Sequence, residues 1–269
     1  MAPTSRVRAA DVMKCTEILG ACLDLGADRD RWPLCLIEGL RDLLRAQVII
    51  ASELLGFGEG QTDHDVALFR IGWPSAEAEA KWVEYAQKAP VEHKPEYPVL
   101  EKMLSGETTR GVTLTRDAIW GGPLVWERSR AFNLVHRECG IDDYIFSIRR
   151  LTLAGTVSVL WVHRAIGDVN FTPRERRLLA FMHDQLVPLV GRALASGTEP
   201  PVGALPRRPR EVLDLLLRGL AEQEIADRLG LSKATVHEHA TRVYRHFGVS
   251  SRGELLARFI GRAIPPIPG

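Results

Sequence analysis

Apolar residues in the last quarter of the chain recur at helical spacing. Within residues 229–249, one narrow sector of a helix at about 100° per residue collects the apolar side chains Val236, Ala240, Val243 and Phe247. The opposite side carries small residues at its start and cations toward its end. We therefore predict a helix over 233–246 with a buried apolar face and an outward polar face.

Further helices surround this one. Gly230 suits the left-handed position that ends a helix, and Ser232 is a good N-cap for the next. Apolar stripes predict helices over 210–219, 220–229 and 251–264. The C-terminal part is thus expected to be an all-α bundle of four helices in roughly 60 residues, two of them joined by a short turn containing glycine.

The first 195 residues mix helical and strand patterns. Helices are predicted at 7–26 and 32–46, and a Thr172-x-x-Glu175 capping box opens a long helix over 171–194. Alternating or β-branched runs predict strands at 46–52, 66–73, 143–153 and 155–164, the last two forming a hairpin around Ala154-Gly155. This pattern favours an α+β fold, an antiparallel sheet flanked by helices.

Residues 194–209 are rich in proline, glycine and small side chains, which is typical of a linker. A chain of 269 residues is also long for a single core. We predict a front domain over 1–195, a linker over 196–204 and a C-terminal domain over 205–269.

Composition narrows the class of protein. Hydrophobic residues make up 45% and charged residues 26%, as in water-soluble globular proteins. No apolar run reaches about 18 residues, and the N-terminus lacks the apolar core of a signal peptide. We expect a cytoplasmic protein without membrane contact. The cysteines show neither metal spacing nor a secretory framework, and they are interpreted as reduced, mostly buried thiols: Cys15, Cys22, Cys35 and Cys139.

The C-terminal helices carry an ordered motif. Arg210-Glu211-Val212-Leu213, Glu224-Ile225-Ala226, Leu229-Gly230-Leu231-Ser232, Thr235-Val236 and Gly248-Val249 follow one another at fixed spacing. In order and spacing this region resembles the DNA-binding domain of LuxR-type transcription regulators. The resemblance implies that helix 233–246 enters the major groove of double-stranded DNA. It implies DNA contact by Lys233, Thr235, His237, Glu238, Thr241, Arg242, Arg245 and Arg252.

Charge agrees with this resemblance. Residues 205–269 hold 11 Lys and Arg against 7 Asp and Glu, a net of +4, whereas the whole chain carries only +1. The cations Lys233, Arg242, Arg245 and Arg252 suit phosphate contact. Base readout falls to His237, which can donate to guanine, to Glu238, which can accept from cytosine, and to Thr241, which offers a methyl group to thymine.

The region departs from the family pattern at several positions. Pro206 stands where a capping hydroxyl is common, Gln223 replaces a basic residue, and His237 and Thr241 stand where lysine is frequent. These departures suggest weaker phosphate contact and an individual target sequence.

The front domain resembles GAF- and PAS-like sensory modules in its topology. Folds of this kind hold a small molecule against one face of the sheet. The aromatic candidates for such a pocket are Trp73, Trp82, Tyr85, Trp120, Trp126, Tyr144, Phe146 and Trp161. Of these we predict ligand contact by Trp82, Tyr85, Trp120, Tyr144 and Trp161. The crossing segment 106–126 is a candidate lid. Acyl-homoserine-lactone receptors share the two-domain architecture, but the spacing around Trp82 and Tyr85 differs and does not assign that ligand.

Other classes fit less well. A phosphoreceiver domain needs an acidic pair after an early strand, and here the first strand is expected only near residue 46. His136 and Cys139 share a helical face but lack further metal ligands, and His183 has no nucleophile nearby. Both histidines are interpreted as helix-surface or half-buried residues. No catalytic site, metal or cofactor is predicted.

We therefore expect a transcription regulator. Its expected partners are double-stranded DNA, an unknown small-molecule or protein signal, the transcription machinery and a second copy in a homodimer. The alternative is a signal-binding adaptor that contacts another protein through the same helical surface.

Overall fold

The computed structural model describes residues 6–55, 64–88, 111–151, 155–260 and 262. These residues separate into two compact units. The N-terminal unit comprises residues 1–19 and 34–188, and the C-terminal unit comprises residues 20–33 and 189–269. The predicted boundaries differ from this division in one respect, because residues 20–33 and 189–204 fold together with the C-terminal helices.

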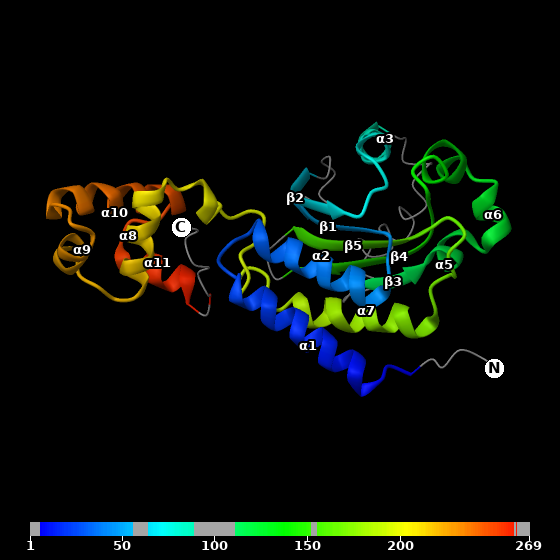
Figure 1. Ribbon diagram of the computed structural model, residues 1–269, viewed down its shortest axis with the longest axis horizontal. Coiled ribbons are helices and arrows are strands. Elements are labelled where there is room, and N and C mark those ends of the chain that lie inside the picture. The colour runs from blue at the N-terminus through cyan, green and yellow to red at the C-terminus, as the bar shows by residue number, and fades with distance from the viewer. Residues whose placement is uncertain (1–5, 56–63, 89–110, 152–154, 261, 263–269) are drawn as a thin grey trace. The chain divides into compact units, whose positions relative to one another are not determined.

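The N-terminal unit is built on a five-stranded sheet in the order β2-β1-β5-β4-β3, with every neighbouring pair antiparallel (Figure 1). Its strands are β1 (Val48–Leu55), β2 (His64–Ile71), β3 (Val112–Thr115), β4 (Ile141–Arg150) and β5 (Thr156–Ala165). The antiparallel α+β architecture is as predicted. β3 was not predicted, because it is four residues long and lies inside the expected lid.

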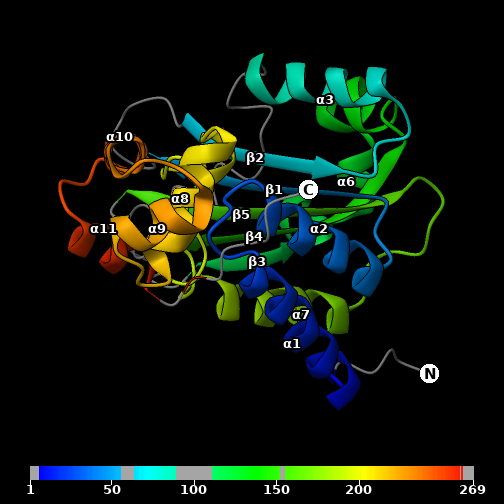
Figure 2. The ribbon, with the colours of Figure 1, turned by 60° about the vertical axis from the view of Figure 1, so that its left-hand side comes forward.

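Helices cover both faces of the sheet. Helix α2 (Arg31–Leu44) and helix α7 (Pro173–Leu186) lie along one face, and α3 (Ala76–Lys88) lies over the other (Figures 1 and 2). The remaining elements of this unit are α1 (Ala9–Asp24), whose last residues belong to the C-terminal unit, and the short helices α5 (Arg116–Trp120), α6 (Pro123–Glu127) and η2 (Phe132–His136).

The hairpin of β4 and β5 has the expected register, with Arg150 opposite Val157. Gly155 of its turn adopts a φ of 67°, while Ala154 lies outside the described residues. One consequence of the register is that Tyr144 and Phe146 face the same side as their partners His163 and Trp161.

Helix α7 is shorter than predicted. Its start is confirmed, since Thr172 and Glu175 form the capping box. The helix ends at Leu186 rather than near residue 194. Pro188 explains the difference, because proline has no backbone N–H to donate and its ring clashes with the carbonyl one turn earlier. Val187 itself is still helical, and its N–H is the last to bond within the helix, to His183 O.

Polar side chains fill the space between α7 and the sheet. The fully buried His183 contacts Ser147 Oγ through Nδ1 at 2.8 Å and Ser158 Oγ through Nε2 at 3.1 Å. Arg149 donates from Nε to Asp184 Oδ1 at 2.6 Å. The interpretation of His183 as a surface or half-buried residue is therefore wrong. Its partners, Ser147 and Ser158, lie on two strands of the sheet, and the spacing of residues along the helix gives no sign of them.

The C-terminal unit contains the four predicted helices. They are α8 (Arg207–Leu217), α9 (Glu222–Leu229), α10 (Lys233–Phe247) and α11 (Arg252–Phe259). Their apolar faces share one core, which includes Leu213 of α8, Ile225 of α9, Val243 of α10 and Leu255 of α11, all 0% exposed.

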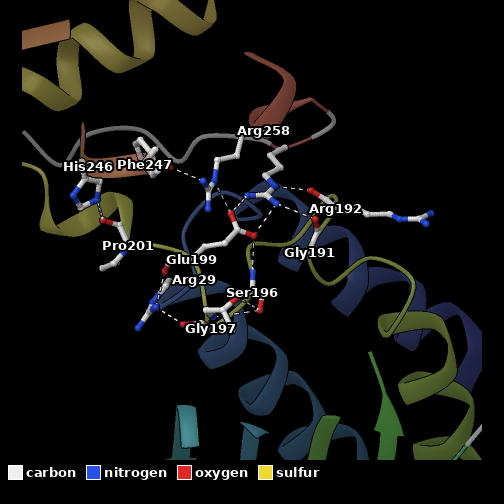
Figure 3. Close-up of polar contacts among 12 residues, drawn as sticks. Arg29, Gly191, Arg192, Ser196, Gly197, Glu199, Pro201, His246, Phe247 and Arg258 are labelled. Atoms are coloured by element: carbon white, nitrogen blue, oxygen red, sulfur yellow. Dashed lines mark hydrogen bonds and ion pairs between the residues drawn. The ribbon is translucent and has the colours of Figure 1, made fainter. Parts of the chain in front are cut away.

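Polar contacts fix the segment before α8, which was predicted to be a linker (Figure 3). The Glu199 carboxylate lies between Arg258 and Arg262, and it accepts from the Arg262 Nη2 at 2.9 Å. Its side chain is only 13% exposed. Arg29 donates to the carbonyl of Glu199 at 2.6 Å, and His246 contacts the carbonyl of Pro201 at 2.9 Å.

The tip of the α1–α2 hairpin joins this arrangement. Trp32 Nε1 donates to Ala195 O at 2.8 Å, and Ala195 N donates to Gly26 O at 2.7 Å. A side chain at position 26 would collide with the carbonyl oxygen of Ala193, 2.2 Å from where its Cβ would lie. Glycine at this position thus permits the close approach of two backbones.

Candidate nucleic-acid interface

The turn between α9 and α10 sets the geometry of the site. Gly230 ends α9 in the left-handed conformation, with a φ of 65°. Ser232 then caps α10, because its Oγ accepts from Thr235 N at 3.1 Å. Both features were predicted from the sequence, and together they make the compact turn of a helix-turn-helix unit.

The inner face of α10 is the predicted one. Val236, Ala240 and Val243 are 0% exposed, and Phe247 is 3% exposed. Phe247 also packs edge-on against Phe259 of α11, with ring centroids 5.1 Å apart. Burial of this face fixes the rotation of α10, so the opposite face is held toward solvent.

The outer face of α10 carries most of the residues proposed for DNA contact. The exposed ones are Lys233, His237, Glu238, Thr241, Arg242 and Arg245. Within the described part of the chain, no hydrogen-bond or ion-pair partner engages the side chains of Lys233, Glu238, Arg242 and Arg245. Three cations and one carboxylate are therefore available to an external molecule.

Thr241 is already oriented by its own helix. Its hydroxyl donates to the carbonyl of His237 at 2.9 Å, one turn earlier. This bond uses the hydroxyl proton, so the methyl group and the lone pairs of the hydroxyl oxygen remain for contact. The methyl group is the part that the thymine contact expected from the sequence would use.

Two of the predicted residues have structural roles. Thr235 is only partly exposed, and its Oγ1 contacts the capping Ser232 Oγ at 2.8 Å. Arg252 is also partly buried and donates to the carbonyl of Leu216 at 3.0 Å, which ties α11 to the end of α8. Their availability to DNA is consequently smaller than that of the cations on α10.

The start of α9 is acidic. Glu222 and Glu224 occupy its first turn, where the helix dipole favours negative charge. Gln223, which replaces a basic residue of the family pattern, donates to Asp227 at 3.0 Å. Glu222 was not among the predicted site residues, although the structure places it against His237 of α10, with 3.1 Å between Glu222 Oε1 and His237 Nδ1.

The ligand candidates of the N-terminal unit gather on the side of the sheet that α3 covers. Two neighbouring clusters contain them, and Tyr85 and Trp161 belong to both. Trp120 donates from Nε1 to Tyr144 OH at 2.8 Å. The ring of Trp82 packs at a tilt against that of Trp73, with 5.6 Å between the ring centroids. The five predicted aromatic residues thus share one face.

His136 and His163 lie on this face too, although neither was among the predicted ligand contacts. The alternation of the strand places His163 on the same side as Trp161, two residues earlier. His136, whose ring centroid lies 5.6 Å from that of His163, is 8% exposed and not the surface or half-buried residue that was predicted. Burial lowers the pKa of His136 to about 3 and that of His163 well below its ordinary value, so both rings are neutral at pH 7.

Trp126 lies at the centre of the same cluster. It is fully buried, and its Nε1 donates to Asp142 Oδ1 at 2.7 Å. Asp142 also accepts from Arg116 Nη1 at 2.7 Å. Trp126 is also the last residue of the candidate lid, 106–126, which includes β3, α5 and part of α6. Residues 106–110 of this segment lie outside the described part of the chain.

No helix among the described residues is both long and apolar enough to span a membrane. The described histidines, cysteines and acidic residues form no group of three or more with the geometry to hold a metal ion. Cys15, Cys22 and Cys139 are buried free thiols, and Cys35 is a partly exposed one.

Comparison with solved structures finds distant likenesses. The VqsR LBD domain from Pseudomonas aeruginosa is 14% identical, with a TM-score of 0.45 over 68% of this chain and 94% of that one. SdiA in complex with octanoyl-rac-glycerol is 14% identical, with a TM-score of 0.42 over 96% of this chain and 97% of that one.

Curated proteins are similar to part of this chain. The transcriptional regulatory protein UhpA of Escherichia coli K12 is 42% identical over 73 residues, which are 27% of this chain and 36% of UhpA. UhpA of Salmonella typhimurium is 41% identical over the same shares. The match thus covers little more than a third of these relatives.

A family comparison gives a match within the C-terminal unit. Residues 204–259 match GerE, described as bacterial regulatory proteins, luxR family. The matched range begins just before α8 and ends at the last residue of α11, so it contains the whole helix-turn-helix. Residues 204–259 are therefore a helix-turn-helix domain of the luxR family of bacterial regulatory proteins.

Proposed function

We propose that the chain is a sequence-specific transcription regulator that binds double-stranded DNA through α10. The outer face of α10 carries the proposal. It holds three cations and one carboxylate without partners among the described residues, on a helix whose rotation is fixed by a buried opposite face. An exposed, pre-oriented polar helix of this kind fits the major groove.

The side chains divide into two tasks under this proposal. Lys233, Arg242 and Arg245 neutralise phosphates and supply affinity that does not depend on sequence. Glu238 and Thr241 reach base edges, the carboxylate accepting from an amino group and the methyl group contacting thymine.

The N-terminal unit is proposed to sense the signal. Tyr144 and Trp161 of the sheet pack with Trp82 and Tyr85 of α3 and with Trp120 of α5. Aromatic side chains with a few polar groups are the usual lining of a small-molecule site. A small apolar molecule with a polar group is the ligand class that this face supports.

Pairing of two chains is part of the proposal. One helix-turn-helix covers a short half-site, and paired modules gain both affinity and spacing specificity. Contact with the transcription machinery is proposed because a transcription regulator must act on it; no particular surface of the described residues is assigned to that contact.

A salt titration tests DNA binding. The full chain is titrated with double-stranded DNA of random sequence at increasing salt, and the affinity is followed by fluorescence anisotropy. Replacing Arg242 and Arg245 together with alanine removes two phosphate contacts, so the slope of log affinity against log salt should become less steep by about 2.

Arg218→Ala is the matched control. Arg218 is an exposed cation of the same unit, but it is paired with Asp214 on α8 at 3.0 Å. This variant should keep the slope of the unchanged chain. Equal slopes for all three proteins, or no DNA binding at any salt concentration, would favour the adaptor alternative, in which the same face contacts a protein.

A further inference from the structure

A side-chain contact crosses the helix-turn-helix between α9 and α10. His237 Nδ1 lies 3.1 Å from Glu222 Oε1, although the two residues are 15 positions apart in the sequence. The His237 side chain is 68% exposed, whereas that of Glu222 is only 28% exposed. A partly buried carboxylate therefore holds one edge of an exposed ring.

The carboxylate decides which ring nitrogen carries the proton. An ionised carboxylate can only accept hydrogen bonds, so Nδ1 must be the donor. In a neutral histidine the other nitrogen then has no hydrogen and presents a lone pair. His237 Nε2 is thus an acceptor, and it has no hydrogen-bond partner in the portion of the chain that the structure describes.

Glu222 is well placed to keep this role. It occupies the first turn of α9, where the helix dipole stabilises a negative charge. Its charge is also felt by Tyr244 of α10, whose pKa is raised by burial first and by Glu222 second, while Arg252 of α11 acts in the opposite direction. The carboxylate thus lies near the junction of three helices.

Resting on the proposed DNA binding, we propose that Glu222 is a positioning residue that makes His237 a hydrogen-bond acceptor toward DNA. In the major groove the amino groups of adenine and cytosine are donors, whereas guanine presents only acceptors there. The chain should therefore select adenine or cytosine opposite His237. This differs from the guanine contact that the sequence alone suggested.

The tautomer can be measured without DNA. Nitrogen–proton correlation spectra of the histidine rings are recorded on the full chain at pH 8, and the His237 signals are identified by their loss in His237→Ala. We expect the proton of His237 on Nδ1. In Glu222→Ala, which removes the acceptor, the proton should move largely to Nε2.

Asp227→Ala is the matched control for that measurement. Asp227 lies on the same helix and carries the same charge, but it accepts from Gln223 and not from His237. It should leave the His237 tautomer unchanged. A proton on Nε2 in the unchanged chain, or an identical spectrum for Glu222→Ala, would overturn the proposal.

Base preference provides the second measurement. A double-stranded DNA library with randomised positions is selected at pH 8 with each variant. The unchanged chain and Asp227→Ala should prefer adenine or cytosine by about fivefold at one position of each half-site. His237→Ala and Glu222→Ala should lose that preference and keep the others.

The two measurements separate this proposal from the proposed function. An Nδ1 proton without any DNA binding would remove the proposed function and leave the tautomer assignment intact. DNA selection in which guanine is preferred at the His237-dependent position would overturn the acceptor role while DNA binding itself stood.

Discussion

Histidines show how differently the two units use polar side chains. In the N-terminal unit His136, His163 and His183 are buried, and His183 is bonded on both ring nitrogens by serines of the sheet. On α10 His237 is mostly exposed and bonded on one nitrogen only. The N-terminal unit thus buries the polar rings of its histidines, whereas α10 leaves one nitrogen of His237 accessible to another molecule. Exposed polar groups on a rigid helix therefore indicate binding more strongly than buried ones do.

Lowering the pH should destabilise the N-terminal unit, which holds the buried histidines. Burial holds the pKa of all three buried histidines below the ordinary value near 6.5. Below pH 6.5 the folded state therefore binds fewer protons than the unfolded state, so the free energy of unfolding falls as the pH falls. At about pH 5.5 the three histidines together should lower the free energy of unfolding by about 4 kcal/mol.

Denaturation followed by tryptophan fluorescence measures this loss, since five of the six tryptophans lie in the N-terminal unit. His183→Gln removes one titrating ring and should reduce the pH dependence by roughly a third. An unfolding free energy that stays constant between pH 7.5 and 5.5 would contradict the buried, neutral state of these rings.

Glu199→Ala should weaken the C-terminal unit next most strongly. The change leaves Arg258 and Arg262 without their shared carboxylate, and the loss should be about 2–3 kcal/mol because the hydrogen bonds involve charged, largely buried groups. Hydrogen exchange of the backbone amides in 189–204 should accelerate. Glu211→Ala is the control, since Glu211 also binds two arginines, Arg207 and Arg208, but both are exposed. Similar exchange in the two variants would argue against a special role for Glu199.

Ser232→Ala tests the turn that orients α10. Loss of the cap should destabilise the helix-turn-helix by about 1 kcal/mol. Thermal unfolding monitored by circular dichroism detects this change. Ser250→Ala, which alters a hydroxyl without a bond to the described residues, should have no measurable effect. Equal melting temperatures for the two variants would mean that the cap contributes nothing.

The sequence was most informative where function depends on local order. The spacing of Val236, Ala240, Val243 and Phe247 predicted both faces of α10, because a helix relates nearby residues by simple rotation. The turn at Gly230 and Ser232 was predictable for the same reason.

The missed features all depend on distant partners. Glu199 is 63 residues from Arg262, and Arg29 is 170 residues from the Glu199 carbonyl that it binds. A proline- and glycine-rich segment therefore indicated a free linker, whereas the folded chain fixes it. Glu222 was missed likewise, because its contact with His237 exists only once α9 packs across α10.

Methylation interference tests the central claim most directly. DNA selected by the full chain is methylated sparsely at guanine N7 in the major groove and adenine N3 in the minor groove, and the bound and free fractions are compared. If the outer face of α10 lies in the major groove, methyl groups at guanine N7 within the half-site should be depleted from the bound fraction, and those at adenine N3 should not. Depletion of adenine N3 methylation alone, with guanine N7 unaffected, would contradict the account.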